Sequence, residues 1–370
     1  MPLGGIYIHI PFCKHKCSYC DFVSFANKPS SNYIDLLIRE IDLYSNIKAF
    51  SNLFFDTLYI GGGTPSILPA KEIARLIQHL QKSKHLIPES EITLEANPES
   101  LNNSNLHQYL ESGINRISIG VQSFDPTVLS NSGRIHTPKT AVDSILLAYK
   151  AGFRNISIDL MMGLPGENSD TWLRNKSFFS QLPIQHLSSY ILDLSPSTLM
   201  HKKIAKGELN LPDENSTLRA YTIWLEYLAS KGWRHYEISN FSLPSYASKH
   251  NMHYWKLDPY AGFGLAATGC LNDIRYTNTR QLTRYHQYVK NKQIPVVHRE
   301  KINPSKKHIE KIMLGLRLLE IGIPFSLLDS EKLLRAQKWV QLGYLKINKK
   351  RLLLTKTGVF FSNAIILSLC

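Results

Sequence analysis

The first 240 residues alternate between two hydrophobic patterns. Short apolar or alternating runs that end in turn signals are typical of strands, and the stretches between them carry apolar residues at the spacing of a buried helix face. In residues 33–44, for example, Tyr33, Leu37, Ile41 and Tyr44 share one face. The expected strands are 6–11, 57–63, 92–98, 116–123, 156–166, 186–194 and 236–242, and the expected helices are 33–44, 70–82, 104–112, 138–151, 169–181 and 216–231.

This alternation predicts a parallel sheet covered by helices, either an open doubly wound sheet or a closed or partial barrel. The polar positions favour the barrel. Gly61–Thr64, Glu95, Gln122 and Asp159 stand at or near the ends of successive expected strands. A single residue of this kind would merely begin its loop, but four strands that each add a polar residue to a common rim are typical of a barrel.

After about residue 280 the pattern changes to that of a small second unit. Residues 306–320 and 329–341 have amphipathic helix patterns, 344–355 is typical of a hairpin turning at 348–350, and a final apolar segment follows. This order predicts a small winged-helix-like domain. We place the barrel in residues 1–285 and the small domain in 300–370, with 291–305 as the linker.

Composition excludes several classes of protein. Hydrophobic residues make up 43% of the 370 residues and aromatic residues 10%, more than a disordered chain has. No apolar run approaches the roughly 20 residues of a membrane-spanning helix, and the N-terminus lacks the basic start of a signal peptide. We therefore expect a soluble cytoplasmic protein. Its net charge of +14 is compatible with nucleic acid, anionic small molecules or an acidic membrane surface as a partner.

Three of the five cysteines, Cys13, Cys17 and Cys20, fall within eight residues, whereas Cys270 and Cys370 stand alone. A secreted disulfide framework would spread an even number along the chain. Clustered thiolates are ligands that iron–sulfur clusters select. Three ligands leave one coordination position open in a four-iron cluster, and an open position serves catalysis or the chelation of a ligand.

The cysteine spacing alone leaves two other interpretations, chance clustering of reduced thiols and a zinc site completed by His9 or His15. The whole segment CKHKCSYC, with Tyr19 before the third cysteine, resembles the signature of the radical S-adenosylmethionine (SAM) superfamily. That resemblance implies a [4Fe–4S] cluster on the three cysteines, with the amino and carboxylate groups of SAM on the fourth iron. It also implies an α/β fold with a partial (β/α)6 TIM-like barrel.

Further segments are similar to the coproporphyrinogen-oxidase-like branch of this superfamily. The GGGTP run resembles an element whose backbone receives the methionine amino group of SAM, and glycines allow such close approach. A carboxylate at a strand end suits ribose hydroxyls and an arginine suits a carboxylate. The cofactor-binding positions that the resemblance implies are Tyr7, Tyr19, Gly62, Gly63, Thr64, Glu95, Gln122, Arg134 and Asp159.

Two groups within the branch compete. In the oxygen-independent coproporphyrinogen III oxidases a fourth cysteine follows two residues after the third, and a long extension precedes the first strand. Here Asp21 and Phe22 follow Cys20, and the sequence starts six residues before Tyr7. The CDF pattern is similar to that of the HemW-type haem chaperones. The resemblance therefore implies a chaperone without coproporphyrinogen oxidase activity.

A second motif agrees. The segment His250–Trp255, HNMHYW, is similar to the HNxxYW motif that HemW-type proteins use for haem. Imidazole is a good axial ligand for haem iron, and aromatic rings can cover a porphyrin face. The resemblance makes His250 the expected ligand, with His253 as a competitor. The following segment departs from the family's glycine-rich pattern, since Ala266 replaces a glycine and Thr268 a histidine.

Together these observations predict a chain that binds a [4Fe–4S] cluster, SAM and haem. The resemblance implies delivery of haem to an acceptor such as a respiratory haem protein, and a cluster-dependent homodimer. The net charge of +14 is compatible with a peripheral location at an acidic membrane surface. The alternative is radical SAM decarboxylation of coproporphyrinogen III. A third class, radical modification of tRNA, rests on charge alone, and the basic residues of the C-terminal helices are also those of any soluble surface. We therefore expect no nucleic acid partner.

Overall fold

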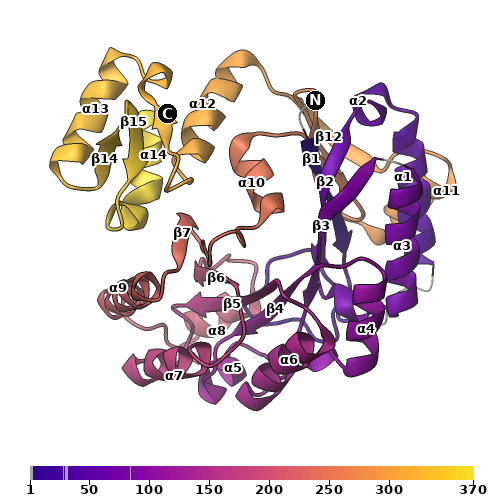
Figure 1. The fold of residues 1–370 in the computed structure, drawn as a ribbon, viewed down its shortest axis with the longest axis horizontal. Helices are drawn as coiled ribbons and strands as arrows, with labels where there is room; N and C mark the ends of the chain where they lie inside the picture. The colour runs from indigo at the N-terminus through magenta and orange to yellow at the C-terminus, as the bar shows by residue number, and fades with distance from the viewer. Residues whose placement is uncertain (1–2, 28, 30–31, 84) are drawn as a thin grey trace.

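The computed structural model describes residues 3–27, 29, 32–83 and 85–370. Its centre is a curved sheet in which six parallel strands follow one another in chain order (Figure 1). These strands are β1 (Leu3–Ile10), β2 (Phe54–Gly62), β3 (Leu86–Ala96), β4 (Arg116–Gln122), β5 (Ile156–Met162) and β6 (His186–Ile191). Among the described strands the two ends of the sheet do not pair with each other, so the prediction of a partial barrel is confirmed.

Helices cover the convex side of this sheet (Figure 1). Side chains alternate along each strand, so Ile6, Ile8 and Ile10 of β1 pack in the core against helix residues such as Leu37, while the intervening side chains face the inside of the barrel. The helices are α1 (Tyr33–Ser45), α2 (Lys48–Ser51), α3 (Ala70–Lys82), α4 (Asn103–Glu111), α5 (Pro126–Asn131), α6 (Pro138–Ala151), α7 (Ser169–Phe179), α8 (Leu199–Ala205) and α9 (Glu214–Ser230), with 3₁₀ turns at Pro65–Ile67 and Pro98–Ser100.

Further strands extend the sheet at both ends. The predicted strand 236–242 is wrong in detail, because it spans parts of two strands of a hairpin, β7 (Arg234–Glu237) and β8 (Asn240–Ser242), of which β8 pairs with β6. At the other end β9 (Tyr260–Phe263) pairs in parallel with β1, and the antiparallel strands β10 (Thr268–Leu271), β11 (Ile274–Asn278) and β12 (Val296–Lys301) follow. The predicted linker 291–305 is therefore also wrong. β12 is a largely exposed edge strand, which lacks the buried alternation that marks a strand in sequence.

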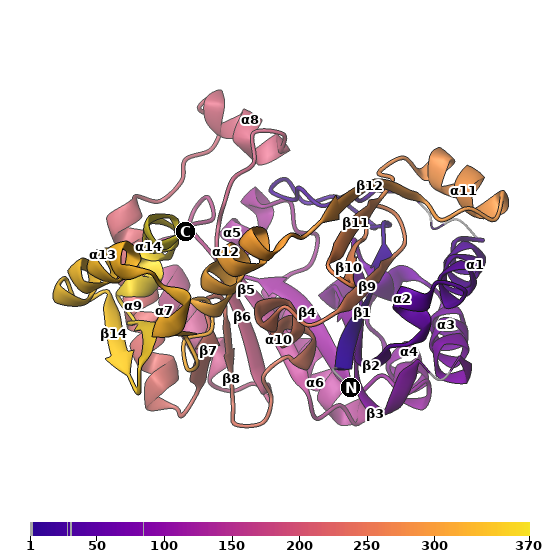
Figure 2. The same cartoon turned by 90° about the horizontal axis from the view of Figure 1, so that it is seen from above.

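The C-terminal segment forms a smaller unit beside α9 (Figures 1 and 2). This unit has a hydrophobic cluster of its own, which includes Ile312, Leu345, Leu352 and Ile365. The hairpin turns at Lys349–Lys350, where both residues have positive φ, as a two-residue turn of this kind requires. Its elements are α12 (Pro304–Gly315), β13 (Ile323–Pro324), α13 (Ser330–Gln341), β14 (Leu345–Asn348), β15 (Arg351–Leu354), α14 (Ser362–Leu369) and 3₁₀ turns at Phe325–Leu327 and Gly358–Phe361, while α11 (Leu282–Lys290) lies earlier. The division at 285 and 300 stays a prediction.

One helix lies on the inner side of the sheet, between β1 and the C-terminal unit (Figure 2). This helix, α10 (Lys249–Lys256), carries the HNMHYW motif. Its N-terminus is capped by the Ser248 side chain, and the Glu91 carboxylate accepts from the backbone N–H groups of Lys249 and His250. No helix in the described ranges is both long and apolar enough to span a bilayer.

Glu40 of α1 ties the helix layer to the antiparallel extension. It is fully buried, and its carboxylate accepts from the Gly264 N–H at 2.8 Å, the Tyr285 hydroxyl at 2.6 Å and the Asn278 amide at 2.6 Å. Burial is the main influence on this group and raises its pKa to about 7, although the three donors act in the opposite direction. Glu40 therefore holds its proton more tightly in the folded chain than in the unfolded chain.

This difference predicts a pH-dependent stability. The contribution of protonated Glu40 is fully present below its unfolded pKa of about 4.5 and is lost as the pH rises towards about 7. Glu40→Gln cannot ionise, so we expect it to reduce the fall in unfolding free energy over this range, by at most about 3 kcal/mol. Urea unfolding at pH 5 and pH 8 measures the change, with the exposed Glu111→Gln as the control. If the unfolding free energy fell by the same amount between pH 5 and pH 8 in Glu40→Gln and in the wild type, the prediction would be contradicted.

Candidate functional site

The three clustered cysteines lie on the loop between β1 and α1. Backbone hydrogen bonds close this loop, from Cys13 N–H to the Phe25 carbonyl at 2.9 Å and from Phe25 N–H to the Pro11 carbonyl at 2.8 Å. Cys13 is buried, and Cys17 and Cys20 are half-buried, all with free thiols. β1 ends at Ile10, directly before Pro11, whose backbone has no N–H to donate to a strand partner, and this leaves the cysteines on irregular backbone at the carboxyl end of β1.

These thiols open onto a cavity of about 530 Å³ at the carboxyl ends of the parallel strands. The loop and the strand ends meet here because parallel strands end at one edge of the barrel. Eight of the ten predicted cofactor positions line the same cavity, and two, Tyr7 and His250, do not. The eight are Tyr19, Gly62, Gly63, Thr64, Glu95, Gln122, Arg134 and Asp159.

Arg134 brings positive charge to the thiols. Its Nη1 donates to Cys17 Sγ at 3.5 Å, and its Nη2 donates to Asn97 Oδ1 at 2.9 Å and to the Gly120 carbonyl. A nearby guanidinium stabilises a thiolate, the form that binds iron. Contacts to Asn97, directly after β3, and to Gly120 of β4 thus hold the Arg134 guanidinium in place, while its Nη1 faces the cysteine loop.

Glu95 bridges β3 and β2. Its Oε1 accepts from the Tyr59 hydroxyl at 2.7 Å, and its Oε2 accepts from the Gly62 N–H at 3.0 Å. A Cβ at Gly61 would lie 2.9 Å from the Glu95 carboxyl, so this glycine is what lets the carboxyl lie against β2. Burial, with the negative charge of Asp159 as a smaller cause, raises the pKa of Glu95 to about 7 despite these two donors.

The thiols fit an iron–sulfur cluster better than a single metal ion. Throughout the described part of the chain, no three His, Cys, Asp or Glu side chains are grouped closely enough to hold one ion. Both ring nitrogens of His9 are bonded, Nδ1 to the Tyr7 hydroxyl at 3.0 Å and Nε2 to the Val23 carbonyl at 2.8 Å, which argues against His9 as a zinc ligand. In a four-iron cluster each thiolate binds a different iron. The three thiols of such a site therefore lie farther apart than three ligands of a single metal ion.

The glycine run packs directly against the cysteine loop. The N–H groups of Gly63 and Thr64 donate to the carbonyls of Ile10 and Phe12, both at 2.8 Å. A Cβ at Gly63 would lie 2.9 Å from Cys13 Sγ and 2.6 Å from the Phe12 carbonyl oxygen. Only glycine allows this approach, which brings the GGGTP backbone to the cavity beside a thiol.

His250 lies away from this cavity, on the inner side of β2. Its Nδ1 is bonded to the Thr57 hydroxyl and its Nε2 to the Tyr254 hydroxyl, each at 2.8 Å, and the side chain is 1% exposed. Burial lowers the pKa of His250 to about 3, so its imidazole is neutral, the form that ligates a metal. In this arrangement a ligand role requires one of the two hydroxyls to give up its hydrogen bond.

The competitor His253 has the opposite charge state. Its Nε2 lies 2.7 Å from Asp56 Oδ1 and its Nδ1 lies 2.9 Å from Asp258 Oδ2. Burial lowers the pKa, but the two carboxylates outweigh it and raise the pKa of His253 to about 9. A protonated imidazole has no lone pair for iron, so His253 in this charge state is not suited to be an axial ligand.

The segment 262–269 has a structural explanation. A Cβ at Gly262 would lie 2.1 Å from the Thr268 carbonyl oxygen, and the Thr268 hydroxyl is 3.1 Å from that of Thr277 on β11. Ala266 has a φ of 58°, a conformation that a glycine would adopt with less strain. These residues shape the β9–β10 turn, and none of them lines the cavity at the cysteines.

Several cavity residues escaped the sequence analysis. Asn97 and Tyr190 line the cavity, and Tyr59 binds Glu95. Asn97 follows Glu95 by two residues in a strand-end segment, and Tyr59 precedes Gly61 by two, so same-face spacing along each strand could have found both. Tyr190 had no such signal, since it continues an apolar strand pattern.

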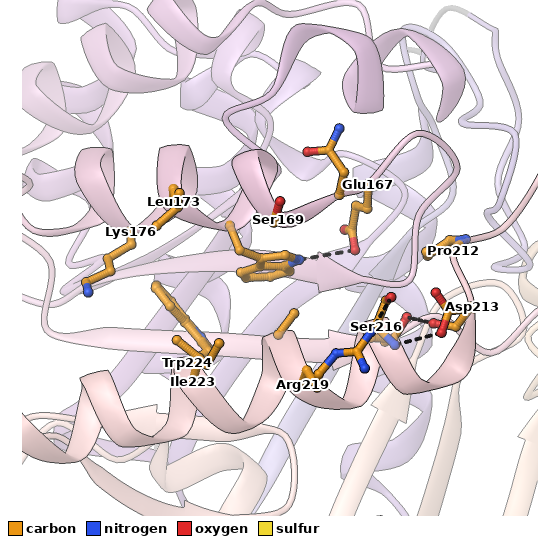
Figure 3. A pocket seen from close by; sticks show the side chains of 14 residues that line it. Glu167, Ser169, Leu173, Lys176, Pro212, Asp213, Ser216, Arg219, Ile223 and Trp224 are labelled. Atoms are coloured by element: carbon orange, nitrogen blue, oxygen red, sulfur yellow. Dashed lines mark hydrogen bonds between the residues drawn. The ribbon is translucent and has the colours of Figure 1, made fainter.

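A separate cavity of about 660 Å³ lies between α7 and α9, outside the barrel (Figure 3). Trp172 and Trp224 form its apolar wall, and the Trp172 Nε1 donates to Glu167 at 3.3 Å. None of the predicted site residues lines this cavity, and the thiols and strand ends face a different space. We therefore assign it no part in the chemistry at the cysteines.

Comparison with known proteins agrees with this geometry. Residues 7–178 match the radical SAM superfamily. The heme chaperone HemW of Lactococcus lactis is 39% identical over 317 residues, which cover 85% of this chain and 81% of that protein. HemW of Mycobacterium tuberculosis is 30% identical over 99% of this chain and 94% of its own length. Coproporphyrinogen III oxidase (HemN) from Escherichia coli has the same fold, with a TM-score of 0.83 over 99% of this chain and 90% of that one at 20% identity.

The partial barrel with three thiols at its rim is that of a radical SAM protein, a class that implies a [4Fe–4S] cluster and SAM as cofactors. Within this class, identities of 30 to 39% over most of both chains are decisive. The chain belongs to the HemW family of haem chaperones.

Proposed function

We propose that this chain binds haem together with a [4Fe–4S] cluster and SAM, and passes the haem to an acceptor protein. One observation carries the proposal. The three thiols and eight predicted cofactor positions line one cavity, in a chain that is 39% identical to a heme chaperone HemW. The shared cavity supports the cofactor part, and the relatives' names support haem as the cargo.

The proposed cofactor-binding residues fall into two groups, those that bind the cluster and those that contact SAM. Cys13, Cys17 and Cys20 would hold the cluster and leave its fourth iron free for SAM, which would supply a sulfonium group for radical chemistry. The backbone of Gly62–Thr64 receives the methionine amino group. The remaining contacts to SAM come from Tyr7, Tyr19, Glu95, Gln122, Arg134 and Asp159. Arg134 also contacts the cluster loop, because its Nη1 donates to Cys17 Sγ at 3.5 Å.

Haem is assigned to His250. Its buried, neutral imidazole is the form that binds iron, whereas His253 is held protonated between two carboxylates. Tyr254 bonds His250, while Trp255 of the same motif packs on Arg317, whose guanidinium lies 4.6 Å from the ring. Of the two aromatic residues, Tyr254 is thus the one beside the ligand.

The proposal extends to partners. The acceptor is a haem protein, and the net charge of +14 supports docking on an acidic membrane surface where respiratory acceptors reside. It also includes a cluster-dependent homodimer, a cytoplasmic location and the two domains at 1–285 and 300–370.

Titration of the anaerobically reconstituted chain with haem tests this function. We expect a Soret band that saturates near one haem per chain, and transfer of that haem when an apo-haem protein is added. Incubation with coproporphyrinogen III, SAM and a reductant should yield no protoporphyrinogen. The absence of saturable haem binding would contradict the proposal, and formation of protoporphyrinogen would instead support the oxidase alternative.

A further inference from the structure

A single side chain on β2 contacts both proposed ligand sites. The Tyr59 hydroxyl donates to Glu95 Oε1 at 2.7 Å, while the Tyr59 ring stacks on the His250 imidazole with centroids 5.1 Å apart and planes at 26°. Thr57, two residues earlier on the same face, bonds His250 Nδ1. The intervening Leu58 is fully buried in the outer core. The inner face of β2 therefore joins the two sites.

At the SAM end, Tyr59 and the expected ligand compete for one carboxylate. Glu95 Oε2 is held by the backbone N–H of Gly62 at 3.0 Å, and Oε1 by the Tyr59 hydroxyl at 2.7 Å. Gly62 belongs to the strand and moves little, whereas a side-chain hydroxyl can turn away. A hydroxyl or ammonium group of SAM that bonds Glu95 would therefore displace the Tyr59 hydroxyl from Oε1.

At the haem end, Tyr59 helps to confine the imidazole. A Cβ at Gly5 would lie 2.9 Å from His250 Nδ1, so β1 lies directly behind the ring. The Tyr254 ring meets the imidazole edge-on, with centroids 5.1 Å apart and planes at 90°. Moving His250 towards an iron therefore requires Tyr59 or Tyr254 to give way.

We propose that Tyr59 couples the two sites, so that SAM at Glu95 raises the affinity of the chain for haem at His250. When SAM takes over Glu95 Oε1, the Tyr59 ring loses the hydrogen bond that fixes it on the imidazole, and His250 can leave its buried position at lower cost. Linkage requires the reverse effect to be equal, so haem raises the affinity for SAM by the same factor. This inference rests on the proposed function, and Tyr59 acts in it as a positioning residue.

The test is haem titration of the reconstituted chain, followed at the Soret band without reductant, in the absence and presence of saturating SAM. We expect haem to bind about fivefold or more tightly with SAM, within the usual range for coupled sites. Equilibrium dialysis of SAM with and without haem should give the same factor. Tyr59→Phe keeps the ring but removes the hydroxyl, so it should bind haem tightly without SAM, and SAM should change that affinity by less than about twofold.

The control is Tyr109→Phe, which also removes a buried tyrosine hydroxyl, one that donates to the Ser66 carbonyl at 3.3 Å in the helix layer. This variant should keep the full coupling of the wild type. Haem affinity that is unchanged or weakened by SAM in the wild type would overturn the inference, as would full coupling in Tyr59→Phe. Failure of the wild type to bind haem at all would instead overturn the proposed function.

Discussion

Replacement of Cys17 by serine is expected to abolish the iron–sulfur cluster of the reconstituted chain. A serine oxygen is a poor substitute for the soft thiolate that iron–sulfur clusters select, and the two remaining thiols supply too few ligands. We expect iron to fall from about four atoms per chain to near zero and the broad visible absorption to disappear. The same result is expected for Cys13→Ser and Cys20→Ser, because all three thiols line one cavity.

Cys270→Ser is the matched control for this experiment. Cys270 lies on β10 with a free, half-buried thiol, and it does not line the cavity of the other three. Its loss should leave iron and sulfide content unchanged. Full iron content in Cys17→Ser, or a loss of iron in Cys270→Ser, would contradict the assignment of the cluster to the loop between β1 and α1.

His250→Ala is expected to remove specific haem binding while the cluster stays intact. Loss of an axial ligand should weaken haem binding by at least about tenfold and eliminate the Soret band of ligated haem. Tyr254→Phe should act in the opposite direction, because it removes the hydroxyl that bonds His250 Nε2 at 2.8 Å and frees that nitrogen for iron. A net hydrogen bond contributes about 0.5–1.5 kcal/mol, so haem should bind roughly 2- to 13-fold more tightly.

His253→Ala separates a ligand role from a structural role in this experiment. His253 is ion-paired to Asp56 and Asp258, so its loss should lower stability but leave the Soret band in place. Thermal unfolding of all three variants shows whether any loss of haem follows loss of fold. Wild-type haem affinity in His250→Ala, or weaker binding in Tyr254→Phe, would remove His250 from the site.

Much of the barrel was predictable because its signal is local. Helices α3 and α6 occupy the predicted ranges 70–82 and 138–151, since the apolar spacing that buries one face also identifies the helix. The predictions failed where an element depends on partners distant in the chain. β12 is a strand only because it pairs with β11, and its exposed residues carry no alternating pattern of their own.

The same contrast between local signals and long-range contacts applies to the candidate site. The thiol spacing, the glycine run and the strand-end polar residues were visible because each is a short segment of chain. The sequence did not show that His250 lies away from the cavity, or that His250 and His253 have opposite charge states. These features depend on Asp56 and Thr57, which lie about 200 residues away in sequence, at separations of 197 and 193.

The sequence by itself predicted the class of fold and the polar positions near the barrel rim, because these follow from periodicity. The resemblance of its short cysteine segment to a known family implied the three proposed cluster ligands. Only the tertiary structure decided which residues stand between the two proposed sites. Tyr59 is an ordinary apolar-strand residue until the barrel places Glu95 on one side of it and α10 on the other. Contacts between separate elements depend on how the sheet curves and where a returning helix packs, and no local pattern of residues records that.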